Sequence, residues 1–270
     1  MQHIRKTSLK DLFQSGNVDS PLEIEDVPAV KGLLWAKYSD EQRHDPKRLQ
    51  EHKTRQLAFS SSTMRYDYRK VGPRPKTGHP LYIALHGGGG APARVNDRGW
   101  DHMKIYYLSS VANGVYVAPR GVSNTSNLHS MPHSYPLYDR LIENMILFEE
   151  VNPNRVYLLG YSAGGDGVYQ VAPRMADRFA AANMSAGHHN GVSPMSLYNL
   201  PFLVQVGERD TAYGRHKATV KFSMKLDGLQ QQYPEGYIHD VFVHSGRGHG
   251  FRDNHPTDPQ MILAKPKLWL

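Results

Sequence analysis

The chain of 270 residues contains no cysteine. A disulfide framework, a thiolate zinc site, an iron–sulfur cluster and a cysteine nucleophile are therefore excluded. No stretch approaches the roughly 18 consecutive apolar residues of a transmembrane helix, so we expect no membrane span. The first residues lack the apolar segment and small-residue cleavage site of a secretory signal, and we expect a cytoplasmic protein.

Acidic residues are fewer than basic ones, 25 against 32, which gives a net charge of +7. The basic residues are spread along the chain, and their densest cluster, residues 65–76, is interrupted by prolines. We interpret them as a solvated basic surface and expect no nucleic-acid partner. The 15 histidines include no HExxH pair and no helical pair beside a third ligand, so we expect no metal site.

Two regions of the chain differ in character. Residues 1–60 are charged and favour helix, and we interpret them as an N-terminal extension, with Ser20 and Pro21 resembling an N-cap and a first helical turn. Residues 61–270 are interpreted as one catalytic domain. No internal repeat or low-complexity tract is present.

From residue 62 onward, short apolar runs alternate with helix-like stretches. The runs that predict strands are 63–71 (as an edge strand), 81–85, 114–118, 155–159, 202–206 and 238–243, with 180–183 as a further candidate. Helices are predicted over 100–112, 138–151 and 215–232. This alternation predicts an α/β fold with an open, mostly parallel, doubly wound sheet and helices on both faces. In such sheets ligands bind beyond the carboxyl ends of the strands.

The run at 155–159 is followed by Gly160-Tyr161-Ser162-Ala163-Gly164, which matches the G-x-S-x-G pattern. This turn from strand to helix holds the serine in a strained conformation. Side chains two residues before and two residues after the serine would collide, so glycine occupies both positions. Ser162 is therefore the predicted nucleophile. An ordinary glycine-rich turn is the alternative. A phosphate-binding loop is disfavoured because neither GxxxxGK[ST] nor GxGxxG is present.

The run at 81–85 is followed by His86 and four glycines. Glycines allow backbone amides to approach a developing oxyanion closely. We predict the amide of Ala163 as one donor and that of Gly88 or Gly89 as the other. His86 precedes the serine strand, and we interpret it as a structural residue that orders the loop.

Asp210 is the predicted acid, because it lies just past the run at 202–206. Glu208 is its close rival. Asp166, just beyond the serine, is better placed as an acidic residue in the first turn of a helix.

His249 is the predicted base, because it lies between glycines on a loop past the last strand. His255 and His244 are the alternatives. His216 falls in a predicted helix, and His239 lies at the start of a strand. The order Ser162, Asp210, His249 is that of the α/β-hydrolase triad.

At these residues the chain resembles the α/β-hydrolase superfamily, and more closely its poly(3-hydroxybutyrate) depolymerase-like, feruloyl-esterase-like and phospholipase/carboxylesterase-type members. The motifs are LYIALHGGGG, VYLLGYSAGGDGVYQVAPRMADRFAA, LVQVGERD and VHSGRGHGF, and they cover roughly residues 62–255. The resemblance implies a serine esterase that cleaves carboxylic esters through an acyl-enzyme, without a metal or organic cofactor. A peptidase, a thioesterase or a non-catalytic binding module on this fold is the alternative.

The substrate is expected to be a small or oligomeric ester. Residues 120–136 follow a strand end and are rich in Ser, Asn, His and Tyr, so we expect them to line the pocket. Trp100 and Tyr161 are candidate aromatic walls, with ordinary packing an equal alternative. Arg120 is a candidate contact for an anionic group. The sequence leaves the oligomeric state open.

Overall fold

The computed structural model describes Thr7, Asp11 and residues 22–250. The chain forms two units, Met1–Thr54 and Arg55–Leu270. Among the described residues no helix is both long and apolar enough to cross a membrane. The predicted helix start at Ser20 and Pro21 lies outside the described residues.

The first unit, where it is described, is helical. A short 3-10 turn η1 (Ile24–Asp26) leads into helix α3 (Val27–Arg43), and α4 (Pro46–Thr54) follows. The start of α4 follows from its sequence. Asp45 Oδ1 accepts a hydrogen bond from the Lys47 amide at 2.7 Å, and Pro46 occupies a position where a helix needs no amide donor.

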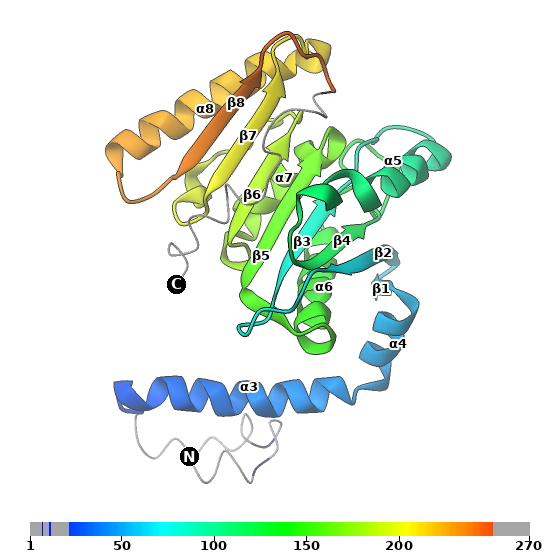
Figure 1. The fold of residues 1–270 in the computed structure, drawn as a ribbon, viewed down its shortest axis with the longest axis vertical. Helices are drawn as coiled ribbons and strands as arrows, with labels where there is room; N and C mark the ends of the chain where they lie inside the picture. Colours follow the sequence, from blue (N-terminus) through cyan, green and yellow to red (C-terminus); the bar gives the residue numbers. More distant parts are fainter. Residues whose placement is uncertain (1–6, 8–10, 12–21, 251–270) are drawn as a thin grey trace. The chain divides into compact units, whose positions relative to one another are not determined.

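The second unit is built on a sheet that has eight strands within the described residues (Figure 1). Their order is β1-β2-β4-β3-β5-β6-β7-β8. The pairs β1–β2 and β2–β4 are antiparallel, and all other pairs are parallel. The strands are β1 (Gln56–Phe59), β2 (Ser62–Val71), β3 (His79–Leu85), β4 (Gly114–Pro119), β5 (Val151–Tyr161), β6 (Ala181–Ser185), β7 (Phe202–Gly207) and β8 (His239–His244).

Helices cover both faces of this sheet. One hydrophobic cluster contains side chains of α6, α7 and α8, and the cluster on the other face contains side chains of α5. Along β3, Leu81 and Ile83 join the first cluster, whereas Tyr82 and Ala84 join the second, as expected of a strand with two buried faces. The helices are α5 (Ala93–Tyr106), α6 (Ser134–Phe148), α7 (Ala163–Val171) and α8 (Arg215–Gln232), with 3-10 turns η2 (Leu108–Ser110), η3 (Ala172–Arg174), η4 (Ala176–Arg178), η5 (Met195–Leu197) and η6 (Ala212–Gly214).

The predicted α/β architecture, an open and mostly parallel sheet with helices on both faces, is confirmed. Three details differ from the predictions. The helix predicted over 138–151 is α6, which ends at Phe148, and Val151 is the first residue of β5. The predicted edge strand, β2, is not an edge, because β1 pairs outside it and buries Leu57 completely. Strand β1 therefore lies within residues 1–60, the predicted N-terminal extension. The helix predicted over 100–112 is α5, which begins at Ala93, directly after Pro92.

Candidate active site

Ser162 stands at the turn between β5 and α7. Its backbone has φ 60° and ψ −122°, a conformation that residues with a side chain rarely adopt. The flanking glycines permit this turn. A Cβ at Gly160 would lie 2.2 Å from the carbonyl oxygen of Gly164, and a Cβ at Gly164 would lie 1.9 Å from that of Leu85. The turn leaves the serine side chain partly exposed beyond the carboxyl end of β5.

His249 lies on the loop after β8 and reaches the serine. Its Nε2 is 2.9 Å from the Ser162 Oγ. The Tyr161 hydroxyl donates a hydrogen bond to the His249 carbonyl at 2.7 Å, and the two rings lie 5.2 Å apart. The loop also passes close over Gly207, where a Cβ would lie 1.9 Å from the carbonyl oxygen of Gly248. The strands that bring Ser162 and Asp210 to the site thus also contact the histidine loop.

Asp210 extends this chain of hydrogen bonds. Its Oδ2 lies 2.7 Å from His249 Nδ1, and its side chain is only 1% exposed. When Nδ1 donates to the carboxylate, Nε2 is left as the acceptor for the Ser162 hydroxyl. The Asp210 carbonyl accepts hydrogen bonds from the amide of His216 at 3.2 Å and from its Nδ1 at 3.0 Å. Arg215 lies 3.6 Å from the other carboxylate oxygen.

The rivals for acid and base occupy other positions. Glu208 accepts hydrogen bonds from the Gly246 amide at 2.6 Å and the Ser245 hydroxyl at 3.2 Å. The Gly246 bond is the main reason that the pKa of Glu208 is lowered. Glu208 therefore anchors the loop that carries His249. His244 Nε2 lies 3.1 Å from the side-chain oxygen of Gln205, at the end of β8.

Two further candidates, Asp166 and His239, make contacts with other residues. The Asp166 carboxylate accepts the His188 amide at 2.7 Å, and burial raises its pKa. His239 pairs with Asp227 at 3.0 Å. His255 lies outside the described residues.

The glycine loop after β3 lies beside the serine turn. Gly88 and Gly89 have φ of 123° and 77°, which favour glycine. The Gly89 amide donates to Asn96 Oδ1 at 2.7 Å, so this predicted oxyanion donor is occupied. Within residues 22–250 the amides of Gly88 and Ala163 have no such partner. These two amides can therefore donate hydrogen bonds to a ligand.

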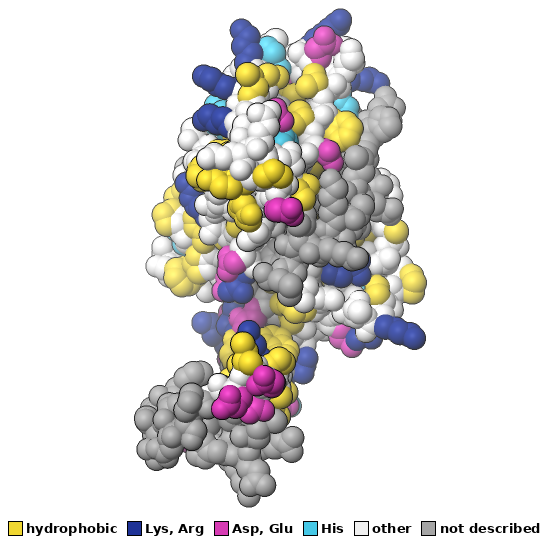
Figure 2. All heavy atoms as spheres, turned by 90° about the vertical axis from the view of Figure 1, so that its left-hand side faces the viewer, with side chains coloured by type: hydrophobic (Ala, Val, Ile, Leu, Met, Phe, Trp, Pro, Cys, Tyr) yellow, Lys and Arg dark blue, Asp and Glu magenta, His cyan; other side chains and the backbone are white. Residues whose placement is uncertain are grey.

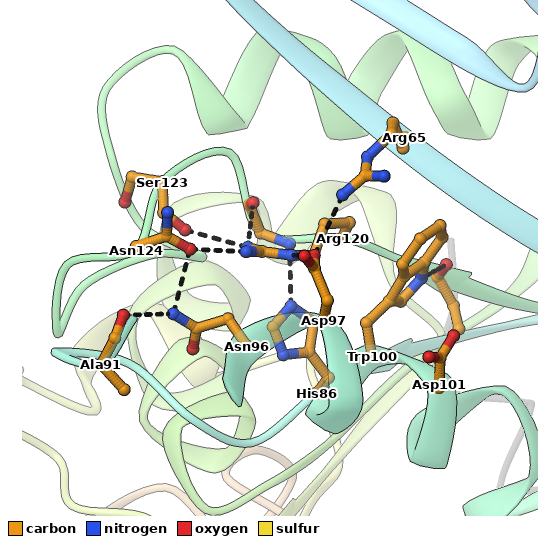
Figure 3. A network of polar contacts seen from close by, with 12 residues as sticks. Arg65, His86, Ala91, Asn96, Asp97, Trp100, Asp101, Arg120, Ser123 and Asn124 are labelled. Carbon is orange, nitrogen blue, oxygen red and sulfur yellow. Dashed lines mark hydrogen bonds and ion pairs between the residues drawn. The ribbon is translucent and has the colours of Figure 1, made fainter. Parts of the chain in front are cut away.

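Arg120, predicted to bind substrate, instead belongs to a polar network behind this loop (Figure 3). Its Nε lies 2.9 Å from Asp97 Oδ1, and its Nη2 donates to Asn124 Oδ1 at 2.5 Å. The same Asn124 oxygen accepts from Asn96 Nδ2 at 3.0 Å. Arg120 is buried and its guanidinium is used internally. The network supports Asn96, which in turn binds the Gly89 amide.

Two buried histidines also order the glycine loop. The Gly121 amide donates to His86 Nε2 at 3.0 Å, and His86 Nδ1 donates to the Gly87 carbonyl at 2.7 Å. His129 Nε2 donates to the His86 carbonyl at 2.9 Å. Burial lowers the pKa of His86 to about 4 and that of His129 well below its usual value. Both rings are therefore neutral near pH 7.

The two predicted aromatic walls have other contacts. Trp100 Nε1 donates to the Ala118 carbonyl at 2.8 Å, and Lys104 Nζ lies 3.8 Å from the centroid of the indole ring. Trp100 thus joins α5 to β4 and does not line the pocket described next. Tyr161 does not line it either, because its hydroxyl binds the loop that carries His249.

A pocket of about 800 Å³ opens beside the glycine loop and Ala163. Its side chains are mostly polar, and they come from the loop after β4, from α7, and from the segments after β6 and β7. Tyr213, 83% exposed, stands at its rim. Among the described residues no cluster of His, Asp and Glu could hold a metal ion. The lining residues are Gly88, Gly89, Gly90, Ser126, Asn127, His129, Ser130, Ala163, Asp166, Gly167, Gln170, His188, Asn190, Tyr213 and Arg215.

Comparison with known proteins identifies the fold. The structure is similar to the BES protein from Bacillus cereus (TM-score 0.53, 12% identity, covering 80% of this chain and 94% of that one). It is also similar to an acetyl xylan esterase from Aspergillus awamori (0.52, 11%, 77% and 97%) and a phospholipase/carboxylesterase from Dyadobacter fermentans (0.51, 12%, 78% and 99%). The chain has the α/β-hydrolase fold. No protein-family model and no curated protein sequence matches it.

Some residues of this candidate site were missed by sequence reasoning. Asn96 lies on α5 and Asn124 on the loop after β4, and they meet only through the fold. His129 and Arg215 fall in segments already singled out, the polar loop 120–136 and the start of the predicted helix 215–232. Their position after strand ends was the available signal, but the sequence does not show the direction of a side chain.

Proposed function

We propose that the protein is a serine hydrolase that cleaves carboxylic esters. The observation that carries this proposal is the continuous chain of hydrogen bonds from the Ser162 hydroxyl through His249 to the buried Asp210 carboxylate. A serine hydroxyl is a weak nucleophile until a base accepts its proton, and a base is most effective when a third group orients it. The names of the similar structures, an acetyl xylan esterase and a phospholipase/carboxylesterase, agree with this proposal.

In the proposed reaction Ser162 Oγ attacks the ester carbonyl carbon while His249 Nε2 takes the hydroxyl proton. Asp210 stabilises the imidazolium that forms. The C–O bond to the alcohol then breaks, and His249 gives its proton to the leaving oxygen. Water, activated by the same imidazole, attacks the acyl-enzyme and releases the acid.

The negative oxygen of each tetrahedral intermediate would accept hydrogen bonds from the amides of Gly88 and Ala163. Ala163 is the first residue of α7, where the helix leaves amides without a partner and carries a partial positive charge. Losing one oxyanion donor costs about 100- to 1,000-fold in kcat. The contacts that hold the glycine loop in this conformation are therefore expected to affect kcat.

The pocket beside these groups favours a compact, polar substrate. A long alkyl chain would need an apolar wall, whereas most of the side chains around the pocket can donate or accept hydrogen bonds. Placing an alkyl chain there would remove water from polar side chains such as those of Ser126 and Ser130 without replacing its hydrogen bonds. We therefore expect short acyl or hydroxylated esters to be hydrolysed faster than long-chain esters.

Labelling with a fluorophosphonate probe followed by peptide mapping tests this proposal. We expect one label, on Ser162, and none on the Ser162→Ala variant. The exposed Ser196 provides a matched control, and Ser196→Ala should label like the wild type. Label on another residue, or none on the folded wild type, would overturn the site assignment.

A panel of p-nitrophenyl esters from acetate to octanoate then tests the reaction and the chain-length preference. We expect kcat/KM to fall with chain length and Ser162→Ala to lose on the order of a millionfold in kcat. Matched oxyester, thioester and amide substrates separate an esterase from a thioesterase or peptidase. Faster turnover of the amide than of the oxyester would contradict the proposed substrate class.

A further inference from the structure

Helix α8 carries lysines and apolar side chains together on its outward face. Lys217, Lys221 and Lys225 are exposed and recur every four residues, so they lie in one stripe along the helix. Val220 and Met224, 47% and 66% exposed, form a second stripe beside it. Figure 1 shows α8 alongside β7 and β8. Figure 2 faces this side of the second unit, and its upper part shows hydrophobic and basic side chains with some acidic ones among them.

The lysine charges are not compensated. The single acidic residue of α8, Asp227, pairs with His239. None of Lys217, Lys221 and Lys225 forms an ion pair in the described part of the chain. Like charges four residues apart destabilise a helix, so this stripe opposes the stability of α8. An anionic partner would remove that repulsion.

The apolar stripe lines a groove between α8 and the edge strand β8. The groove has a volume of about 550 Å³, and Val220, Met224 and Val243 line it together with His216 and the two lysines Lys217 and Lys221. Glu208 is its only acidic residue, and its carboxylate already binds the Gly246 amide and the Ser245 hydroxyl. The face is therefore cationic and apolar at once.

We propose that this α8–β8 face docks on an anionic lipid bilayer. Val220, Met224 and Val243 would enter the headgroup region while the lysines contact lipid phosphates. Interfacial binding of this kind combines buried apolar area with attraction to anionic lipids. The three lysines extend over about 12 Å of helix at 1.5 Å per residue, so they can contact several headgroups. The proposal does not depend on the proposed esterase activity.

A bilayer fits this face better than a protein or a nucleic acid. Protein interfaces rely on tryptophan, tyrosine and arginine anchors, and none of these lines the groove. Nucleic-acid sites place aromatic or arginine side chains between their cations, whereas Val220 and Met224 lie between these lysines.

Sedimentation with lipid vesicles tests the docking surface without using catalysis. We expect the full chain to bind vesicles containing about 30 mol % phosphatidylglycerol and not pure phosphatidylcholine. Each lysine near an anionic surface contributes roughly fivefold in affinity, so K217Q/K221Q/K225Q should bind on the order of 100-fold more weakly. Met224→Gln should weaken binding severalfold, and more visibly at high salt, where charge attraction is screened.

A matched control changes three exposed lysines of the first unit, K31Q/K47Q/K53Q, and so removes the same charge. It should lose less than about threefold in vesicle affinity. Equal loss in both triple variants would mean that net charge alone drives binding, and would overturn the proposal. Absence of wild-type binding to anionic vesicles at low salt would also overturn it. A third contrary result would be a wild-type dimer that the K217Q/K221Q/K225Q substitutions convert to a monomer, because the face would then be a protein interface. Hydrolysis of p-nitrophenyl acetate by the variants should match that of the wild type.

Discussion

Asn96 is the residue through which the polar network reaches the glycine loop, and its replacement is the sharpest test of that arrangement. The side chain is fully buried and makes three hydrogen bonds: to the Gly89 amide, the Ala91 carbonyl and Asn124 Oδ1. Asn96→Ala removes all three and leaves the partner atoms unsatisfied. It also releases the Gly89 amide from its acceptor. The backbone of the neighbouring Gly88, our proposed oxyanion donor, is then no longer held in place.

The structure sets the expected size of both effects. Each buried hydrogen bond contributes about 0.5–1.5 kcal/mol net, so Asn96→Ala should lower the free energy of unfolding by about 2–4 kcal/mol. In a domain of this size, that corresponds to a fall in Tm of roughly 5–15 °C. Complete loss of one oxyanion donor costs about 100- to 1,000-fold, so a displaced Gly88 should lower kcat by about 10- to 100-fold. KM should change little, because the substrate pocket keeps its side chains.

Urea unfolding and steady-state kinetics on p-nitrophenyl acetate measure the two effects separately. Asn124→Ala breaks the link to Arg120 but keeps the Asn96–Gly89 bond, so its kcat should lie between those of Asn96→Ala and the wild type. Asn154→Ala, at an exposed position, should match the wild type in both assays. A destabilised Asn96→Ala protein with unchanged kcat would refute the inference that Asn96 positions the glycine loop for catalysis.

Tyr161→Phe removes only the hydroxyl that binds the His249 carbonyl, so we expect kcat to fall about 3- to 10-fold at constant KM; equal kcat values would show that this contact does not position the imidazole. Gly164→Ala would place a Cβ 1.9 Å from the Leu85 carbonyl oxygen, and we expect destabilisation by more than about 4 kcal/mol or no soluble protein. A Gly164→Ala protein with the same urea midpoint as the wild type would contradict this. The pKa of His86 is about 4 in the folded protein against 6.5 for an unperturbed imidazole, so the unfolded chain binds more protons between these pH values. Stability should therefore fall as the pH drops from 6.5 toward 4, by about 3 kcal/mol in all. Urea midpoints at several pH values should show a shallower dependence for His86→Asn than for the wild type, and parallel curves would refute the assignment.

The predictable part of the fold is the part fixed by local patterns. Apolar runs of five or so residues, such as 81–85 and 155–159, lie within β3 and β5 because strands buried on both faces need continuous apolar sequence. Strand β1 was not predicted because only Leu57 of its four residues is buried, so the strand has no alternating or continuous apolar pattern. It depends on pairing with β2, a tertiary contact that does not appear in local sequence.

The residues of the candidate site divide in the same way. Ser162, Asp210 and His249 could be proposed because each follows a strand, and the parallel sheet brings those strand ends to one edge. The substrate contacts could not be inferred by the same reasoning. Arg120 and Trp100 also follow or face strand ends, but Arg120 is buried against Asp97 and Trp100 binds the Ala118 carbonyl.

The loop that carries His249 explains why the candidate site needs contacts beyond the three hydrogen-bonded side chains. The loop contains Gly246 and Gly248, and ordering one residue costs about 1–2 kcal/mol in backbone entropy. Hydrogen bonds to neighbouring residues offset that cost. Among them, the Tyr161 hydroxyl binds the His249 carbonyl and Glu208 binds the Gly246 amide. Tyr161 is adjacent to Ser162, and Glu208 is two residues from Asp210. Each anchor is therefore tied to the strand that presents one partner of the imidazole, so a shift of either strand moves the anchor and the partner together.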